Sequence, residues 1–159
     1  MLPIFSGRPI RVDIRKSLGA HIAASSIRGR VIHLDSSVFA RHGEFERILI
    51  HELFHFCWVR LSNRHRRDWE SVLSSEFSNH TRGELGWSAE WRKETLVRAD
   101  SRARTPGWRR YACESFCDTA AWVYAGIRVH DEFTLPAKAR AVRKKWFAAS
   151  FPDDATISI

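Results

Sequence analysis

The sequence predicts an α+β domain, with a small sheet in its first third and helices over the rest of its 159 residues. Residues 10–14 alternate apolar and polar side chains, which is the period of a half-buried strand, and residues 30–34 form a second extended run. From about residue 43 onward, apolar residues recur at helical spacing, in segments separated by polar or Gly- and Pro-containing loops. A chain of this length is most simply one domain, so we expect a single domain over 1–159.

Gly29 indicates a turn or a bulge before the second strand. The first helix is predicted after the two strands, over about 43–62. Four further helices are predicted, at about 67–78, 88–104 and 108–126 and from Pro136 onward. The last helix is expected to bury Ala139, Val142 and Trp146 and to expose its basic residues. The tail from about residue 152 is predicted to fray.

The chain is basic, with 26 Lys and Arg residues against 18 Asp and Glu residues and a formal net charge of +8. Such a charge attracts nucleic acids or acidic proteins. The charges are dispersed, however, and aromatic residues do not alternate with them as a single-strand binding face requires. We therefore favour an arginine-rich solvated surface. The basic segments are residues 64–67, 98–104, 109–110 and the set Lys138, Arg140, Arg143, Lys144 and Lys145.

Several features predict a cytoplasmic protein. No apolar run approaches the length of a membrane span, and the first residues lack the basic start and apolar core of a signal peptide. Cys57, Cys113 and Cys117 are odd in number and lie in apolar helical segments. They are typical of reduced core residues rather than of a disulfide framework.

The most informative motif is His51-Glu52-Leu53-Phe54-His55, in the middle of the most apolar helix. Two imidazoles and a carboxylate without partners in a buried helix would cost about 1–3 kcal/mol for each group. His51 and His55 lie one turn apart and face the same way, as two ligands of one metal ion do. Glu52 lies about 100° round the helix, within reach of a metal-bound water. The motif therefore predicts one catalytic Zn²⁺ ion.

A catalytic zinc site needs a third protein ligand. A metzincin would carry Gly at position 58 and His at position 61, but the chain has Trp58 and Leu61, so that class is excluded. His80 and Glu84 lie in a predicted loop and stay open as ligands.

Glu114 is the strongest candidate, because it is an acidic residue on an otherwise apolar helix. Asp118 follows one turn later on the same face, where its carboxylate can accept a hydrogen bond from a ligand histidine. The competing interpretation is that both face solvent or pair with Arg109, Arg110 or Arg128. Cys113 and Cys117 flank Glu114, but zinc held by two helix histidines usually takes a carboxylate.

The two motifs together, His51-Glu52-x-x-His55 and Glu114-x-x-x-Asp118, resemble those of the gluzincin branch of the zincin metallopeptidases. The resemblance covers about residues 10–128. It implies a zincin-like minimal catalytic domain, in which a small sheet with an edge strand packs on the HExxH helix and a glutamate helix. Residues of about 63–107 would be a helical insertion.

The resemblance also implies roles for single residues. His51, His55 and Glu114 would bind zinc, Glu52 would be the general base, and Asp118 would hydrogen-bond a ligand histidine. The strand at 30–34 would be the edge that binds an extended peptide or protein substrate. An oxyanion stabiliser is also expected, and Tyr111 and His130 are candidates.

The leading hypothesis is thus a zinc metallopeptidase, a hydrolase of peptide bonds. Two alternatives stay open. HELFHFCW also loosely resembles the proteases that clear DNA–protein crosslinks, whose third ligand is usually a histidine, and the basic charge would suit that function. The second alternative is a regulatory module that binds zinc without catalysis. The presence of Glu52 does not favour it, because a structural zinc site needs no base.

Overall fold

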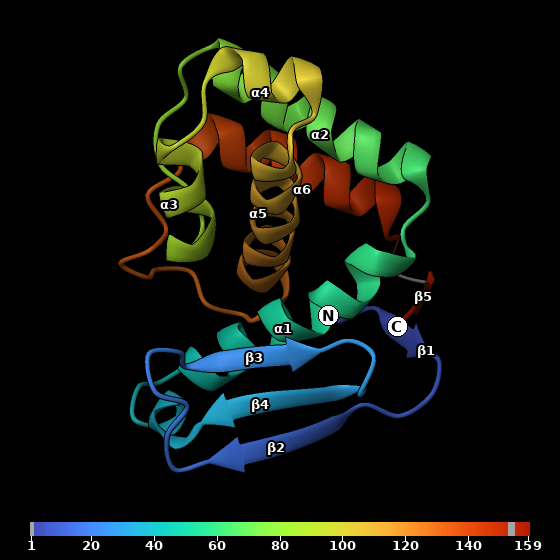
Figure 1. Ribbon diagram of the computed structural model, residues 1–159, viewed down its shortest axis with the longest axis vertical. Coiled ribbons are helices and arrows are strands. Elements are labelled where there is room, and N and C mark those ends of the chain that lie inside the picture. The colour runs from blue at the N-terminus through green and yellow to red at the C-terminus, as the bar shows by residue number, and fades with distance from the viewer. Residues whose placement is uncertain (1, 153–154) are drawn as a thin grey trace.

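The computed structural model describes residues 2–152 and 155–159 and has mixed α and β structure, which confirms the predicted α+β class. The main sheet has three strands in the order β2-β4-β3 (Figure 1). Strand β2 (Arg11–Arg15) pairs with β4 (Val31–Asp35) in parallel, and β3 (Ala23–Ser26) pairs with the other side of β4 in antiparallel register.

The prediction that the strand at 30–34 is a sheet edge is wrong. Strand β4 lies in the centre, with Val31, Ile32 and Leu34 buried, and the edge beside the first helix is β3. The sequence of β3, Ala-Ala-Ser-Ser, has little strand propensity of its own. It becomes a strand because the turn at residues 27–30 returns the chain along β4, with Ser25 opposite Ile32.

The prediction of a frayed tail is also wrong for the residues described there, 152 and 155–159; residues 153–154 lie outside the described part. Strand β5 (Thr156–Ser158) pairs in parallel with β1 (Ile4–Ser6) at the opposite end of the chain. Ile157 is buried in the core, and this burial of apolar surface fixes a segment that is too short to show periodicity.

In the described part of the chain, six α-helices follow the main sheet, after a 3₁₀ turn at Ser36–Phe39. They are α1 (Glu44–Arg60), α2 (Asn63–Ser78), α3 (Trp87–Glu94), α4 (Arg98–Ala103), α5 (Pro106–Tyr124) and α6 (Ala137–Ser150). One helix was predicted over 88–104, but the chain forms two, since Val97 is extended and its N–H donates to the Asp100 carboxylate to begin α4. No helix of the described chain has the length and apolarity to cross a membrane.

Helix α1 lies between the main sheet and the other helices (Figure 1). On one side, Ile48 and Phe56 pack on Ile32 and Leu34 of the sheet. On the other, Phe54 joins a large aromatic core with α2, α5 and α6. The motif helix is therefore apolar around most of its circumference because it is buried on two sides.

The buried face of α6 differs from the predicted one. Ala139 is buried and Trp146 is partly buried, but Val142 is 48% exposed. Arg143, predicted to be a surface charge, is fully buried between Glu76 and Glu84. Two carboxylates far away in the sequence offset the cost of burying its guanidinium, and periodicity within one helix does not reveal them.

Candidate metal centre

The imidazoles of His51 and His55 meet on the face of α1 that packs against α5. Their Nε2 atoms are 3.2 Å apart, as expected for residues one helical turn apart with both rings turned the same way. His51 is 8% exposed, and the His55 side chain is 19% exposed. The predicted pair is thus formed in a largely buried position.

Glu114 of α5 faces this pair. Its Oε2 atom lies 3.4 Å from His51 Nε2 and 3.8 Å from His55 Nε2. Ligand atoms around a tetrahedral zinc ion lie about 3.3 Å apart, given bond lengths of about 2.0–2.1 Å. The two nitrogens and the carboxylate oxygen therefore fit the dimensions of a zinc site.

The outer nitrogens of both rings have partners that orient them. His51 Nδ1 lies 2.7 Å from Asp118 Oδ1, and His55 Nδ1 lies 3.5 Å from Cys113 Sγ. A proton on each Nδ1 satisfies these partners and leaves the Nε2 lone pair free. Three electron-rich atoms then converge on one point, which is favourable only if a cation or an added proton lies between them.

The carboxylate of Glu114 is ionised at neutral pH, as a metal ligand must be. Burial raises its pKa, but hydrogen bonding to His51 and the charges of His55, His51 and Arg92 hold it at about 2. In the metal-free protein, Asp118 raises the pKa of His51 well above its usual value against the effect of burial. A proton thus competes with a metal ion for the same lone pairs.

Helix α3 holds Asp118 in place. Ser88 Oγ and the backbone N–H of Ala89 donate to Asp118 Oδ2 over 3.1 and 3.2 Å. Gly86 precedes this helix, and a Cβ atom there would lie 2.3 Å from the Asp118 carboxylate. The segment 63–107, which was predicted to be an insertion, therefore supports the site through α3. In the sequence, the glycine at position 86 is the one feature that we connect with this role.

Arg92 extends from α3 to the rim of the site. Its Nη2 atom lies 3.3 Å from Glu114 Oε1, whereas Oε2 is the oxygen that pairs with the imidazoles, and the Arg92 side chain is 38% exposed. Arg109, Arg110 and Arg128 were the partners considered from the sequence. The cation that pairs with Glu114 belongs instead to a helix brought in by the tertiary fold.

Glu52 lies beside the imidazole pair, with a carboxylate oxygen within 4.8 Å of both rings. It is 8% exposed, and Ser25 Oγ donates to its Oε2 atom over 2.5 Å. No protein donor reaches the other carboxylate oxygen within the described part of the chain. Ser25 belongs to the edge strand β3, so the sheet and the motif helix together fix the orientation of the Glu52 carboxylate. The sequence analysis did not identify Ser25.

Four other candidates face elsewhere. Tyr111 is fully buried and donates to Glu84 Oε1 over 2.6 Å, and Glu84 also pairs with Arg143. His130 binds Glu44, about 10 Å from His51 along the helix. His80 contacts Arg98 on the surface. Neither predicted oxyanion stabiliser, and neither alternative ligand, meets the imidazole pair.

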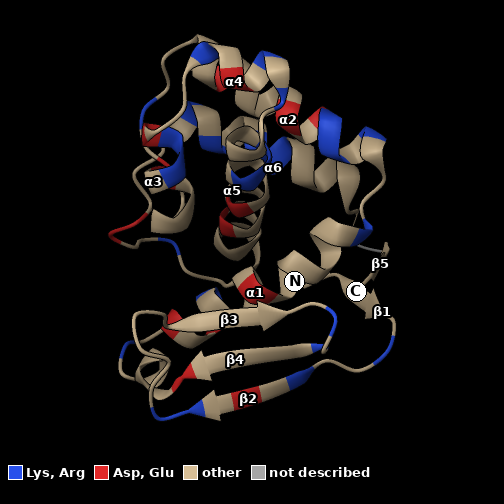
Figure 2. Cartoon of the chain, viewed as in Figure 1, with Lys and Arg blue, Asp and Glu red and all other residues tan. Residues whose placement is uncertain are grey.

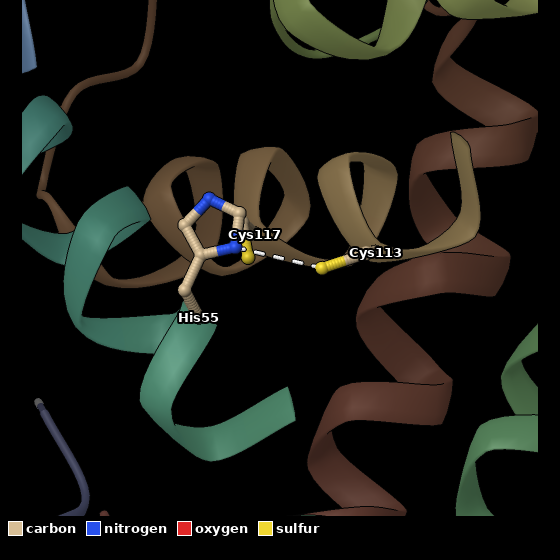
Figure 3. Close-up of side chains that lie close together, drawn as sticks. All are labelled: His55, Cys113 and Cys117. Atoms are coloured by element: carbon tan, nitrogen blue, oxygen red, sulfur yellow. Dashed lines mark hydrogen bonds between the residues drawn. The ribbon is translucent and has the colours of Figure 1, made fainter. Parts of the chain in front are cut away.

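The two cysteines of α5 lie beside His55 (Figure 3). A hydrogen bond from Cys117 lowers the pKa of Cys113 to about 6, and His55 adds to this effect against that of burial. Burial raises the pKa of Cys117 well above its usual value. The sequence indicated Cys113 and Cys117 only as a disfavoured alternative to the carboxylate ligand.

Comparison with known proteins adds no assignment, because no protein-family model, no curated protein and no solved structure matches the chain. The geometry of the site is therefore the basis for a function.

Proposed function

We propose that the protein is a zinc-dependent metallopeptidase of the zincin type, which hydrolyses peptide bonds with zinc bound by His51, His55 and Glu114. The convergence of two imidazole nitrogens and a carboxylate oxygen, all within 3.8 Å of one another, carries this proposal. The neighbouring Glu52 distinguishes a hydrolase from a structural zinc site, because a structural site needs no base.

Zinc bound there would supply a water of lowered pKa and polarise the carbonyl of the substrate. Glu52 takes the proton of the attacking water and delivers it to the leaving amine. Ser25 holds the Glu52 carboxylate in one orientation. Asp118 fixes the tautomer and direction of His51, and Arg92 holds the Glu114 carboxylate and adds to the lowering of its pKa by the histidines.

The order of elements supports a zincin-like arrangement. An antiparallel edge strand, β3, lies beside the HExxH helix α1, and the glutamate helix α5 packs against α1. Through Ser25, β3 approaches the general base. We propose that an extended peptide or protein substrate pairs with β3, in place of the strand at 30–34 named from the sequence.

Of the two alternatives, the regulatory module leaves Glu52 without a role, and the crosslink protease also has less support. A crosslink protease would usually present a histidine as third ligand, whereas the carboxylate of Glu114 faces the imidazole pair. Lys and Arg residues are spread over several helices and loops (Figure 2), which does not favour a nucleic-acid partner over a solvated surface.

All three cysteines are free, which fits the cytoplasm that we propose as the compartment.

The test is Glu52→Gln, assayed for hydrolysis of a diverse peptide library and for zinc content. The variant keeps the shape of the side chain but loses the base, so we expect no measurable hydrolysis while zinc stays at one ion per chain. Glu46→Gln, an exposed residue of the same helix, is the matched control and should leave both unchanged. Loss of zinc from Glu52→Gln, or full activity in it, would contradict the proposed role.

A further inference from the structure

His55 presents its second ring nitrogen to a different set of ligands (Figure 3). Its Nδ1 atom faces Cys113 and Cys117, which lie one turn apart on α5. The three ligand atoms are all within 4.8 Å of one another, and Cys113 Sγ is 3.5 Å from Nδ1. One imidazole thus joins two groups of potential metal ligands.

The donor set defines the class of ion. Two sulfurs and one imidazole nitrogen favour thiophilic cations such as Cu⁺ or Cd²⁺ over Mg²⁺ or Ca²⁺, which prefer oxygen. These soft cations also bind thiolates more tightly than Zn²⁺, which is only borderline-soft. Cys117 is fully buried, and Cys113 and His55 are partly exposed, which gives a small ion access from one side. Cys57 offers a contrast within the chain, because it is buried in the apolar core on the other motif helix.

In a third group of possible metal ligands, an arginine side chain already neutralises the carboxylates. Glu44, His130 and Glu132 lie close together at the beginning of α1, but the buried guanidinium of Arg47 pairs with both carboxylates. No lysine or arginine pairs with Cys113 or Cys117 in this way within the described residues.

We propose that His55 Nδ1, Cys113 and Cys117 form a second metal site, which takes a thiophilic cation and excludes zinc from the first site. Both cysteines bind as thiolates, so binding releases to solvent whatever thiol protons they still carry, and it moves the imidazole proton from Nδ1 to Nε2. Since a neutral imidazole has one lone pair, the Nε2–H bond then points at His51 and Glu114, where zinc would bind. The exclusion of zinc rests on the proposed function, in which His51, His55 and Glu114 bind zinc. The binding of a cation by His55, Cys113 and Cys117 does not depend on that proposal.

The first experiment is titration of the metal-free, reduced protein with Cd²⁺, followed by the sulfur-to-cadmium charge-transfer absorption. We expect a band that saturates at one ion per chain and is lost in the double variant Cys113→Ser/Cys117→Ser. Cys57→Ser should keep the band. A circular dichroism spectrum and a melting temperature close to those of the wild type show that the double variant is folded. Absence of the band in the wild type, or its persistence in the double variant, would overturn the proposed site.

The second experiment adds Cd²⁺ to the zinc-loaded protein and measures released zinc with a chromophoric indicator. We expect one zinc ion released per thiolate-bound Cd²⁺ in the wild type, and about tenfold more Cd²⁺ to be needed in the double variant. Zinc retained while the sulfur band saturates would disprove the exclusion. Neither readout uses peptide hydrolysis, so failure of the peptidase proposal and failure of this one are distinguishable.

Discussion

Two clusters of buried polar groups lie against α5 and differ in how their charges are balanced. At one, Arg143 is enclosed between Glu76 and Glu84, with Lys93 and Tyr111 also bound to Glu84. The protein itself supplies both signs of charge there.

The other cluster surrounds His51 and His55, and its acceptors are not balanced in the same way. Glu114 and Asp118 bring two carboxylates to two imidazoles. Arg92 contacts Glu114 at Oε1, whereas Asp118 has no ion pair with an arginine or lysine within the described residues and feels the charge of Arg47 only from a longer distance. The fold neutralises the first cluster with the side chains of arginine and lysine, whereas at the imidazole pair the balancing charge can be a proton on His51 or, as we propose, a zinc ion. This difference is the reason for proposing a metal ion at the imidazole pair and none at the Arg143 cluster.

The largest expected effect is a loss of stability at the cluster around Arg143. Arg143→Met removes the cation between the two carboxylates, which leaves Glu76 without an ion pair and Glu84 with Lys93 as its remaining cation among the described residues. This should lower the free energy of unfolding by about 3–5 kcal/mol. Chemical denaturation measures it. Lys144→Met, at the exposed neighbouring position on α6, is the matched control and should change stability by no more than about 0.5 kcal/mol. A small effect of Arg143→Met would show that the ion pairs are not what balances this cluster.

Acid should break the same cluster. Burial raises the pKa of Glu84, but the charge of Arg143 outweighs this and lowers it from 4.5 to about 2. Because the folded-state pKa is below the unfolded one, its stabilisation is present above about pH 4.5 and is lost as the pH falls toward 2. Between about pH 6 and pH 3 the metal-free wild type should lose about 2 kcal/mol more than Glu84→Gln. Parallel pH profiles of the two proteins would contradict the depressed pKa.

At the imidazole cluster, Asp118→Asn should weaken zinc binding about 10–100-fold, because the charge that orients and polarises His51 is removed. Competition with a chelator of known affinity measures the change. Asp131→Asn, at an exposed position outside the site, should leave the affinity unaltered. Unchanged zinc affinity in Asp118→Asn would separate Asp118 from the metal centre.

The smallest effect is expected at Ser25. Ser25→Ala removes the hydrogen bond to Glu52, so kcat should fall by up to about tenfold while zinc affinity is unchanged. Ser26→Ala, at the next residue of β3, points to the other face of the strand and should have no effect. Equal losses in the two variants would mean that β3, rather than this hydrogen bond, is what matters.

Sequence analysis succeeded where the information is local. The helical period around His51 and the spacing of Glu114 and Asp118 were sufficient to predict α1, α5 and the residues that meet between them. It failed where the partner is distant. Arg143 is 59 residues from Glu84, and β3 has no strand signal apart from its pairing with β4.

The same limit explains the residues of the site that were missed. Ser88 and Arg92 reach Asp118 and Glu114 only because α3 packs on α5, and Ser25 reaches Glu52 only because β3 is the sheet edge. The two misplaced oxyanion candidates, Tyr111 and His130, were chosen by sequence proximity to Glu114. Their actual partners, Glu84 and Glu44, lie far from them along the chain.

The central claim is that the imidazole pair and Glu114 hold one divalent zinc ion. Zinc K-edge X-ray absorption of the purified protein, with total metal analysis, tests it most directly. We predict one zinc per chain with two imidazole nitrogens and a carboxylate oxygen, and loss of the oxygen shell or of the zinc in Glu114→Ala. A protein that takes up no zinc, or a coordination sphere that is the same in Glu114→Ala, would contradict the claim.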